Sequence, residues 1–467
     1  MRTVSAVLLV LLLASFGQAQ QNWTKTYGGP EANIGEAVRQ TSDGGYIATG
    51  WTTSSGGHDT AVYLIKTKDT GDTLWTRTYG GSGGDFGYSV QQTSDGGFIV
   101  AGYTNSFGAD SNDVYLIKTN ASGDTLWTRT YGGTGDDEGY SVQQTSDRGY
   151  IIAGYTWAAG LREYDFYLVK TDSFGDTLWT RTYGGNGDDY GYSVQQTSDG
   201  GYIVAGSTSS FGAGEDDAYL VKTNASGDTV WTRTYGGSSV EYVYSVQQTS
   251  DGGYVVAGST NSYGAGRDDV YLVKTRASGD TAWTRTYGGS SSDGGYCVQQ
   301  TSDRGYIVTG YTSSFGAGVE DVYLVKTDSL GDTLWTRTWG TTGDDWSTSV
   351  RQTSDGGYIV AGTTSSETDW CDVWLIKTDA NGHAGVAEPA VSREMRGATR
   401  IVAVPNPFVS STRIPGHDGD RFEVYDASGK MVGAYRGNRI GEGLLPAVYF
   451  IRSGDERGGS LRVVKAR

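Results

Sequence analysis

The stretch "WTRTYGG" at residues 127–133 returns at a constant spacing through most of the chain. The same string, or one that differs by one or two residues, begins at Trp23, Trp75, Trp179, Trp231, Trp283 and Trp335, which gives a period of 52 residues. A fixed period of this length indicates a repeat architecture in which each unit packs against its neighbours. We therefore treat the repeats as parts of one large domain.

Four segments in each repeat have the composition of β-strands. In the fourth copy they are residues 192–197, 202–208, 218–223 and 229–235, all rich in Tyr, Val, Ile, Trp and Thr. The connections "TSDGGY" and "NASGDT" are short and contain glycine, as tight antiparallel hairpins require. The links "YGGNGDDYG" and "SSFGAGEDD" are longer and vary between copies. Because strand direction alternates, we expect one constant face with the short turns and one variable, acidic face with the long links.

These features predict an all-β fold, a seven-bladed β-propeller with four strands in each blade. The runs "YIVAG" and "VYLVK" are apolar on both faces, as expected for a sheet that lies between two others. The last copy ends with "VWLIKT" at residues 373–378 and has no following Trp strand, whereas "NWTKTYGG" at residues 22–29 is unaccompanied. We expect this N-terminal strand to complete the last blade, which hides the sheet edges. An open solenoid is the alternative.

The ends of the chain differ from the repeats. Residues 1–20 have the basic start, apolar run and small-residue site of a signal peptide. The predicted organisation is a signal peptide (1–19), the propeller (20–378), a linker (379–399) and a small C-terminal β-sandwich (400–467). The apolar run is shorter than the roughly 20 residues of a membrane-spanning helix. We expect a secreted monomer without a transmembrane segment, extracellular or attached to the cell surface.

The charge balance limits the partners. A net charge of −17 disfavours nucleic acid, because phosphate binding needs clustered Lys and Arg. The repeated Lys222 and Arg233 positions are expected to pair across strands with carboxylates such as Asp228. Cys297 and Cys371, the two cysteines of the chain, fall in consecutive repeats and could form a disulfide or be unrelated substitutions.

One hairpin of the repeat resembles a known structural motif. The segment "KTDSFGDTLW" at residues 170–179 is similar to the tryptophan-docking motif of quinoprotein-like propellers, although its spacing differs by one residue and those propellers have eight blades. The resemblance implies that the tryptophan packs one blade against the next. It implies no quinone site.

The C-terminal part resembles a second family. The segments "PNPF" (405–408), "VYDASGKMV" (424–432) and "LPAVYFIR" (445–452) and a basic terminus resemble the sorting domain of type IX secretion cargo and the Ig-like domain of flagellar hook-capping proteins. Ala447 departs from this pattern, because a glycine is common there. The resemblance implies that this domain directs secretion through that machinery; in that family it is often removed when cargo is attached to the surface, and whether it is cleaved here stays open.

Residues with catalytic chemistry are sparse. The three histidines, His58, His383 and His417, lie in separate parts of the chain, and no Walker loop or HExxH motif occurs. We therefore assign no catalytic residue. Paired aspartates in the long links could coordinate Ca²⁺ or cap turns, so a metal site stays undetermined.

Three segments that break the repeat add aromatic side chains to the variable face. Aromatic rings beside carboxylates are typical of sugar-binding surfaces. The candidate ligand-binding residues are Trp157, Tyr164, Tyr242, Trp370, Asp136, Asp137, Asp188, Asp189, Asp344 and Asp345.

The sequence thus favours a non-catalytic binding or adhesion scaffold whose partner is a polysaccharide or a surface protein. One alternative is a glycoside hydrolase, which needs two carboxylates about 5 to 5.5 Å apart for retention or about 6.5 to 9.5 Å apart for inversion. A further alternative is a structural surface component without a small ligand.

Overall fold

The computed structural model describes residues 22–53, 60–109, 111–158, 163–366 and 369–385, and short strand segments at 412–413, 421–426, 431–436, 439–440, 448–453 and 460–464. The chain divides into two units, Met1–Glu388 and Pro389–Arg467, which we describe separately. The predicted signal peptide and most of the predicted linker lie outside the described residues.

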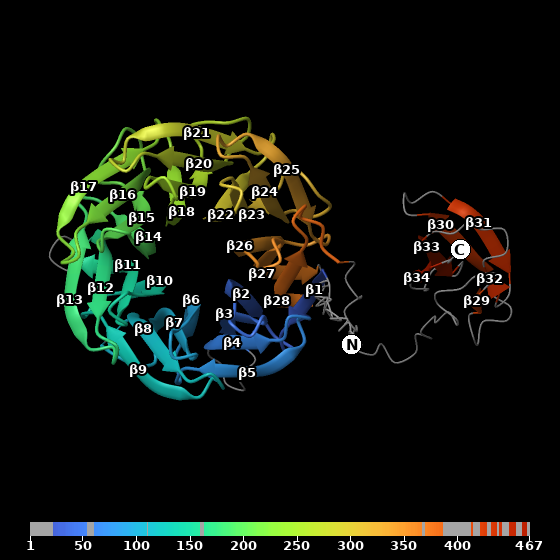
Figure 1. Cartoon of the computed structure of the whole chain (residues 1–467), viewed down its shortest axis with the longest axis horizontal. Coiled ribbons are helices and arrows are strands. Elements are labelled where there is room, and N and C mark those ends of the chain that lie inside the picture. The colour runs from blue at the N-terminus through green and yellow to red at the C-terminus, as the bar shows by residue number, and fades with distance from the viewer. Residues whose placement is uncertain are drawn as a thin grey trace, which may run out of the picture. The chain divides into compact units, whose positions relative to one another are not determined.

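The first unit is a ring of seven four-stranded antiparallel sheets (Figure 1). Blade 1 contains β2 (Asn33–Gln40), β3 (Tyr46–Thr52), β4 (Ala61–Thr67) and β5 (Thr73–Tyr79), from the centre outward. Blades 2 to 6 repeat this order. Blade 2 contains β6 (Asp85–Gln92), β7 (Phe98–Thr104), β8 (Asp113–Thr119) and β9 (Thr125–Tyr131), and blade 3 contains β10 (Asp137–Gln144), β11 (Tyr150–Ala158), β12 (Glu163–Thr171) and β13 (Thr177–Tyr183). Blade 4 contains β14 (Asp189–Gln196), β15 (Tyr202–Thr208), β16 (Asp217–Thr223) and β17 (Thr229–Tyr235), blade 5 contains β18 (Glu241–Gln248), β19 (Tyr254–Thr260), β20 (Asp269–Thr275) and β21 (Thr281–Tyr287), and blade 6 contains β22 (Asp293–Gln300), β23 (Tyr306–Thr312), β24 (Asp321–Thr327) and β25 (Thr333–Trp339).

Blade 7 joins the two ends of the propeller. It contains β26 (Asp345–Gln352), β27 (Tyr358–Ser366) and β28 (Asp369–Thr378), and its outer strand is β1 (Trp23–Tyr27). β1 pairs antiparallel with β28, from Trp23 opposite Lys377 to Tyr27 opposite Val373. The prediction that the N-terminal strand completes the last blade is confirmed. The propeller is closed and is not an open solenoid.

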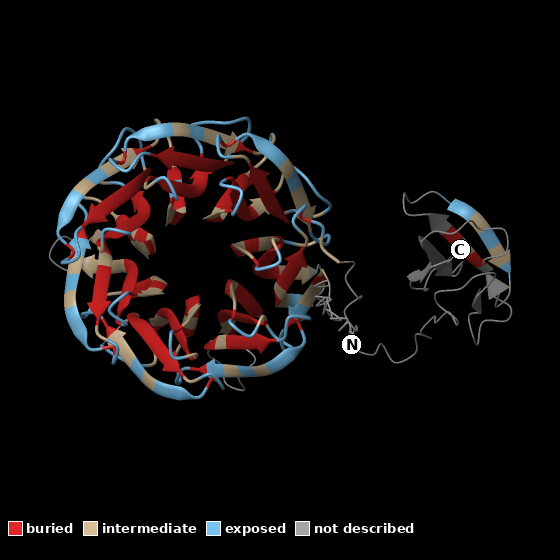
Figure 2. Ribbon diagram, in the orientation of Figure 1, coloured by how far each residue is buried: buried red, intermediate tan, exposed pale blue. Residues whose placement is uncertain are grey.

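The hydrophobic core lies between the blades. One cluster joins Leu64 and Tyr79 of blade 1 to Val90 and Phe98 of blade 2, and each of these residues is at most 9% exposed. Figure 2 shows buried inner strands, and outermost strands in blades 1 to 6 on which exposed and partly buried residues alternate. Both faces of the inner strands are covered, which explains their continuous apolar runs.

The tryptophan of each outer strand packs on the following blade. The Trp75 ring of β5 lies 5.9 Å from the Phe98 ring of β7, in an edge-on arrangement. A Cβ atom at Gly123, where φ is +80°, would lie 2.8 Å from the Trp75 ring, so only glycine fits both the turn and the packing. Equivalent pairs are Trp23–Tyr46, Trp127–Tyr150, Trp179–Tyr202, Trp231–Tyr254, Trp283–Tyr306 and Trp335–Tyr358. The similarity to the tryptophan-docking motif of quinoprotein-like propellers stays a resemblance.

Two more residues of "WTRTYGG" complete this contact. The Tyr79 hydroxyl donates a hydrogen bond to Gly123 O at 2.7 Å. The Arg77 guanidinium lies 5.6 Å from the centre of the Trp75 ring and 3.6 Å from the carboxylate of Asp124 in the next blade. The tyrosine bond recurs from Tyr27, Tyr131, Tyr183, Tyr235 and Tyr287, whereas β25 carries Trp339 at this position.

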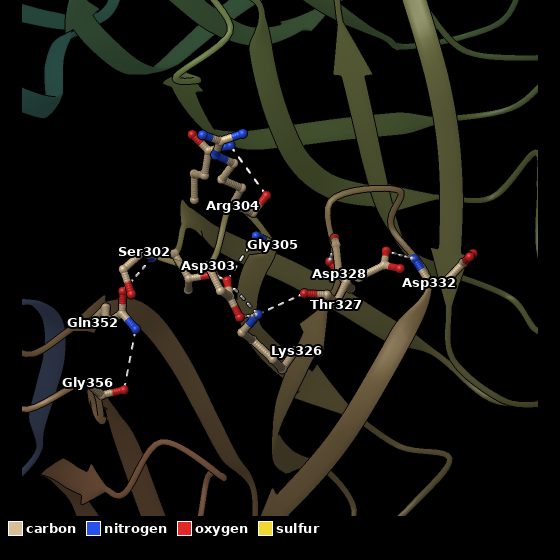
Figure 3. Close-up of polar contacts among 12 residues, drawn as sticks. Ser302, Asp303, Arg304, Gly305, Lys326, Thr327, Asp328, Asp332, Gln352 and Gly356 are labelled. Atoms are coloured by element: carbon tan, nitrogen blue, oxygen red, sulfur yellow. Dashed lines mark hydrogen bonds and ion pairs between the residues drawn. The ribbon is translucent and has the colours of Figure 1, made fainter.

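Each short turn of the "TSDGGY" type is stabilised by a buried lysine, and Figure 3 shows the copy at residues 301–306, which reads "TSDRGY". The Lys326 ammonium lies 2.8 Å from the Asp303 carboxylate and donates to Thr327 O. Ser302 N donates to Gln352 Oε1 of the next blade at 2.8 Å. The short-turn face is therefore bonded around the ring.

The expected pairing of Lys222 with Asp228 is wrong. Lys222 pairs with Asp199 of its own blade at 2.9 Å, because its side chain points toward the short turn before the preceding strand. Asp228 instead lies 3.5 Å from Arg181 of the preceding blade.

The second unit contains a four-stranded antiparallel sheet in the order β31 (Met431–Arg436), β30 (Arg421–Asp426), β33 (Val448–Ser453) and β34 (Ser460–Val464). A separate pair is formed by β29 (Thr412–Arg413) and β32 (Arg439–Ile440). Phe422 and Val424 of β30 are buried. The Ig-like sandwich and the sorting role stay predictions, and residues 405–408 lie outside the described residues.

Replacing Gly175 by alanine tests the docking contact. A Cβ atom there would lie 2.8 Å from the Trp127 ring, whereas one at Gly200, which has a similar positive φ, meets nothing within 4 Å. Both substitutions place alanine in the left-handed region, at a cost of roughly 1–2 kcal/mol. We expect Gly175→Ala to lower the thermal unfolding midpoint clearly more than Gly200→Ala. Equal losses would contradict the docking role of the tryptophan.

The ion pair between the buried Lys222 and Asp199 predicts that the stability of the protein depends on pH. Burial alone would raise the pKa of Asp199, but hydrogen bonds from Thr197, Lys222 and Gly201 hold this pKa at about 2, against 3.8 for a free aspartate. Between these values the unfolded chain binds more protons, so the contribution of Asp199 is present above about pH 4 and is lost toward about pH 2.

We expect Asp199→Asn to be less stable than the wild type near neutral pH, by a margin that shrinks as the pH falls toward about 2. Urea unfolding of both proteins at several pH values measures this margin. A margin that does not change with pH would contradict the stabilising role of the ionised carboxylate.

Candidate functional site

The long links lie together on one face of the propeller. Asp137 N donates to Asn112 O at 2.7 Å, which joins the link that enters blade 3 to the link between β7 and β8. Gly83 N donates to Ser106 Oγ at 2.9 Å in the same way in blade 2. The two kinds of long link therefore share the variable face.

The second aspartate of each predicted pair closes a turn. Asp137, Asp189 and Asp345 begin the innermost strands β10, β14 and β26 and are at most 1% exposed. Their carboxylates accept hydrogen bonds from the backbone N–H groups of Gly133, Gly185 and Thr341, at 2.7, 2.9 and 2.6 Å. This burial takes the three carboxylates out of the candidate contact surface.

The first aspartate of two pairs stays half-buried at the variable face. Asp136 Oδ1 accepts from Asn112 N at 3.2 Å, and Asp188 Oδ1 accepts from Tyr164 N at 3.0 Å. The pKa of the Tyr164 hydroxyl is raised by burial and then by the negative charges of Asp136 and Glu138. The backbone bonds orient both carboxylates toward the same aromatic residue.

Aromatic rings connect these groups across three blades. The Tyr164 ring centre lies 4.9 Å from that of Trp157 and 5.4 Å from that of Tyr190. Burial and the charge of Asp216 raise the pKa of the Tyr242 hydroxyl, and Tyr242 is 38% exposed. Ring contacts continue between these residues through Tyr190–Tyr192, Tyr192–Tyr244 and Tyr242–Tyr244. We call Trp157, Tyr164, Tyr190, Tyr242, Asp136, Asp188 and Asp216 the aromatic–acidic face.

Two candidate residues lie elsewhere. Trp370 of β28 is 70% exposed and makes no ring contact with the other described aromatic side chains. Asp344 lies in the link that enters blade 7 and forms a β-bridge with Glu320 of blade 6. Burial and then the negative charge of Asp344 raise the pKa of Glu320. Trp370 and Asp344 thus belong to blade 7 and lie apart from blades 3 to 5.

Sequence reasoning missed Glu138 and Tyr190. Glu138 is 8% exposed and accepts hydrogen bonds from Asn112 Nδ2 at 2.9 Å and from the Tyr140 hydroxyl at 2.6 Å. A signal was available, because this strand position varies between the copies and only tyrosine occurs there twice. It reads Ile34, Phe86, Glu138, Tyr190, Tyr242, Gly294 and Trp346.

Blades 1 and 7 also depart from the other copies at the β-bulge of the innermost strands. Five blades carry Tyr88, Tyr140, Tyr192, Tyr244 and Tyr296 at the residue where the strand register shifts. Blade 1 carries Glu36 and blade 7 carries Thr348. Burial raises the pKa of Glu36 to about 8.

The described residues offer no cluster of metal-binding side chains and no membrane-spanning helix. No group of three or more His, Cys, Asp or Glu side chains in this part of the chain could hold a metal ion. Cys297 and Cys371 are both free thiols. No helix of the described residues is long and apolar enough to cross a membrane.

No protein-family model matches the chain. The chain is 24% identical to the regulatory protein FlaEY of Caulobacter vibrioides over 331 residues, which cover 64% of this chain and 32% of FlaEY. The chain thus spans about a third of the length of this relative.

Solved structures with a similar arrangement include PorZ of Porphyromonas gingivalis, described as an essential bacterial surface component of the type IX secretion system. It is 12% identical with a TM-score of 0.39, over 94% of this chain and 60% of PorZ. The WD40 domain of Neurospora crassa Pan2 is 10% identical with a TM-score of 0.46, over 78% of this chain and 96% of that domain.

Glu36→Tyr gives blade 1 the residue of five other blades and tests the half-buried carboxyl of Glu36. A free glutamate titrates near 4.5 and Glu36 near 8, so the native protein binds more protons between these values and loses stability as the pH rises through them. We expect the variant to gain stability over the wild type as the pH rises from about 5 to about 8, measured by urea unfolding. Thr348→Tyr, which removes no carboxyl, should show no such trend, and an equal trend would contradict the assignment to Glu36.

Proposed function

We propose that the protein is a non-catalytic binding scaffold of the cell surface, and that its aromatic–acidic face binds polysaccharide. The observation that supports this most directly is the grouping of Trp157 and Tyr164 beside Asp136 and Asp188 on the variable face. In the same way Tyr242 lies near Asp216. The three aromatic residues come from repeat-breaking segments, whereas the docking residues recur in nearly every blade.

The chemistry of the face suits a sugar. Aromatic rings offer flat apolar surfaces on which sugar rings stack, and oriented carboxylates accept hydrogen bonds from hydroxyl groups. Asp136 and Asp188 are held by backbone N–H groups before any ligand arrives. Such preorganisation reduces the entropy lost on binding.

The scaffold around the face is rigid. β11 and β12 of blade 3 have nine residues each, against seven in β7 and β8. The extra length pairs Trp157 with Tyr164 and Ala158 with Glu163. Both aromatic residues therefore stand on paired strands and not on a loose loop.

The glycoside hydrolase stays the alternative. Burial raises the pKa of Asp216, and an acid catalyst of a glycosidase needs such a carboxyl. The proposal has further parts, which are export through the signal peptide, sorting by the C-terminal domain and contact with the secretion machinery. They are supported by the sequence resemblance alone.

A glycan array probed with the full chain, with and without Ca²⁺, tests the binding function. We expect ligand-selective signal that falls roughly tenfold or more in Trp157→Ala and Tyr242→Ala, because truncating an aromatic contact residue commonly costs more than 1.4 kcal/mol. Trp370→Ala is the matched control, since it removes an exposed ring in another blade.

If no glycan on the array gives a binding signal, or if the signal falls only in Trp370→Ala, binding at the aromatic–acidic face is contradicted. Unfolding midpoints of the variants report whether the fold is retained. Release of reducing ends from polysaccharides, lost on Asp216→Asn, would instead support the hydrolase.

A further inference from the structure

A ring of glutamines lies near the end of the innermost strands. Each accepts a hydrogen bond from a backbone N–H of the following blade, at 2.6 or 2.7 Å. They are Gln91, Gln143, Gln195, Gln247 and Gln299. Blades 7 and 1 carry arginine at this position, Arg351 on β26 and Arg39 on β2.

The two arginines lie on adjacent strands. Val38 N donates to Ser349 Oγ at 3.3 Å across the junction of blades 1 and 7, which brings β2 and β26 side by side. A guanidinium has no acceptor atom, so neither arginine can accept the backbone bond that glutamine accepts in the other blades. The change therefore introduces two positive charges and removes two acceptors.

Each guanidinium has few partners. Arg351 Nη1 donates to Val350 O at 2.6 Å and to Cys297 Sγ at 3.0 Å. Arg39 Nη1 is buried and has no hydrogen-bond acceptor. Burial lowers the pKa of Arg39, and the charge that opposes this shift is the Cys297 thiol, the same group that Arg351 contacts.

Neither arginine forms an ion pair with a carboxylate of the described residues. The ion pairs among the described residues involve outer-strand arginines such as Arg129, which lies 3.3 Å from Asp176, and not Arg39 or Arg351. The chain as a whole carries a net charge of −17. Two unpaired guanidinium groups at the centre of so acidic a protein are costly unless an anion compensates them.

We propose that Arg39 and Arg351 together bind one small oxyanion, a phosphate or a carboxylate, at the end of the propeller axis on the short-turn side. The planar guanidinium presents N–H donors in a fork that matches either anion. The anion would supply the negative charge that both guanidinium groups lack.

This anion site is independent of the aromatic–acidic face. Arg39 is one residue from the end of β2, next to the short turn, whereas Asp136 and Glu138 flank the start of β10, next to a long link. The two sites therefore lie at opposite ends of the innermost strands. Loss of one should leave the other intact.

Thermal unfolding of the full chain in increasing inorganic phosphate or acetate, with sodium chloride adjusted to constant ionic strength, tests the site. We expect at least one of the two anions to raise the wild-type midpoint progressively, as for any ligand bound only by the native state. Titration calorimetry with the active anion should give one site per chain. Acetate alone would identify a carboxylate site, and phosphate alone a phosphate site.

The informative variant is Arg39→Gln with Arg351→Gln, which restores the residue of the other five blades and is expected to fold. It should lose the anion-dependent rise, and its midpoint without anion should be higher than that of the wild type. The control Arg148→Gly also removes one arginine and restores a repeat residue, since other copies have glycine at this positive-φ turn position. It should keep the response.

No response of the wild type beyond that to sodium chloride would overturn the proposal. Retention of the full response in the double variant, or its loss in Arg148→Gly, would overturn it as well. Glycan binding measured on the same double variant separates this result from the proposed function.

Discussion

The fold depends on one contact, the packing of an outer-strand tryptophan on the glycine turn of the next blade. At the first junction Trp75 fills the space beside Gly123, Tyr79 bonds the carbonyl of that glycine and Arg77 reaches the adjacent Asp124. Alternation along a strand puts these three side chains on one face, so a single heptapeptide carries the whole interface. Because each blade buries its faces only against neighbours, the contact must recur at every junction, including the one made by β1.

This constraint separates the parts of the repeat that are fixed from those that are free. The outer strands and short turns face the same partner in each blade and hardly vary. The long links and a few positions of the innermost strands have no such partner, and there the copies differ. The aromatic–acidic face and the arginine pair both arise at such positions, at opposite ends of the innermost strands. Function in this architecture is therefore expected where a copy departs from its neighbours.

Much of the fold could be predicted from the sequence because repetition reports the period, the strand count and the unaccompanied strand at Trp23. The site was harder. Asp137 and Asp189 look like surface carboxylates in sequence, but each begins a strand and bonds the backbone of the turn before it. For Lys222 the sequence predicts Asp228 as the partner, whereas the structure pairs it with Asp199. Sequence distance does not report which end of a hairpin a side chain reaches. Glu138 and Arg39 could have been found by comparing equivalent positions, whereas the absence of an acceptor for Arg39 Nη1 depends on packing that only the structure contains.

Hydrogen–deuterium exchange of the β1 amides tests the closed ring most directly. β1 pairs with β28 along its length, and Trp23 packs on Tyr46 and Gly71 of blade 1. The paired amides of β1 should therefore exchange as slowly as those of the other outer strands, such as β5 and β9. Rapid exchange of β1 while β28 and the other outer strands stay protected would mean that the ring is not closed by this strand.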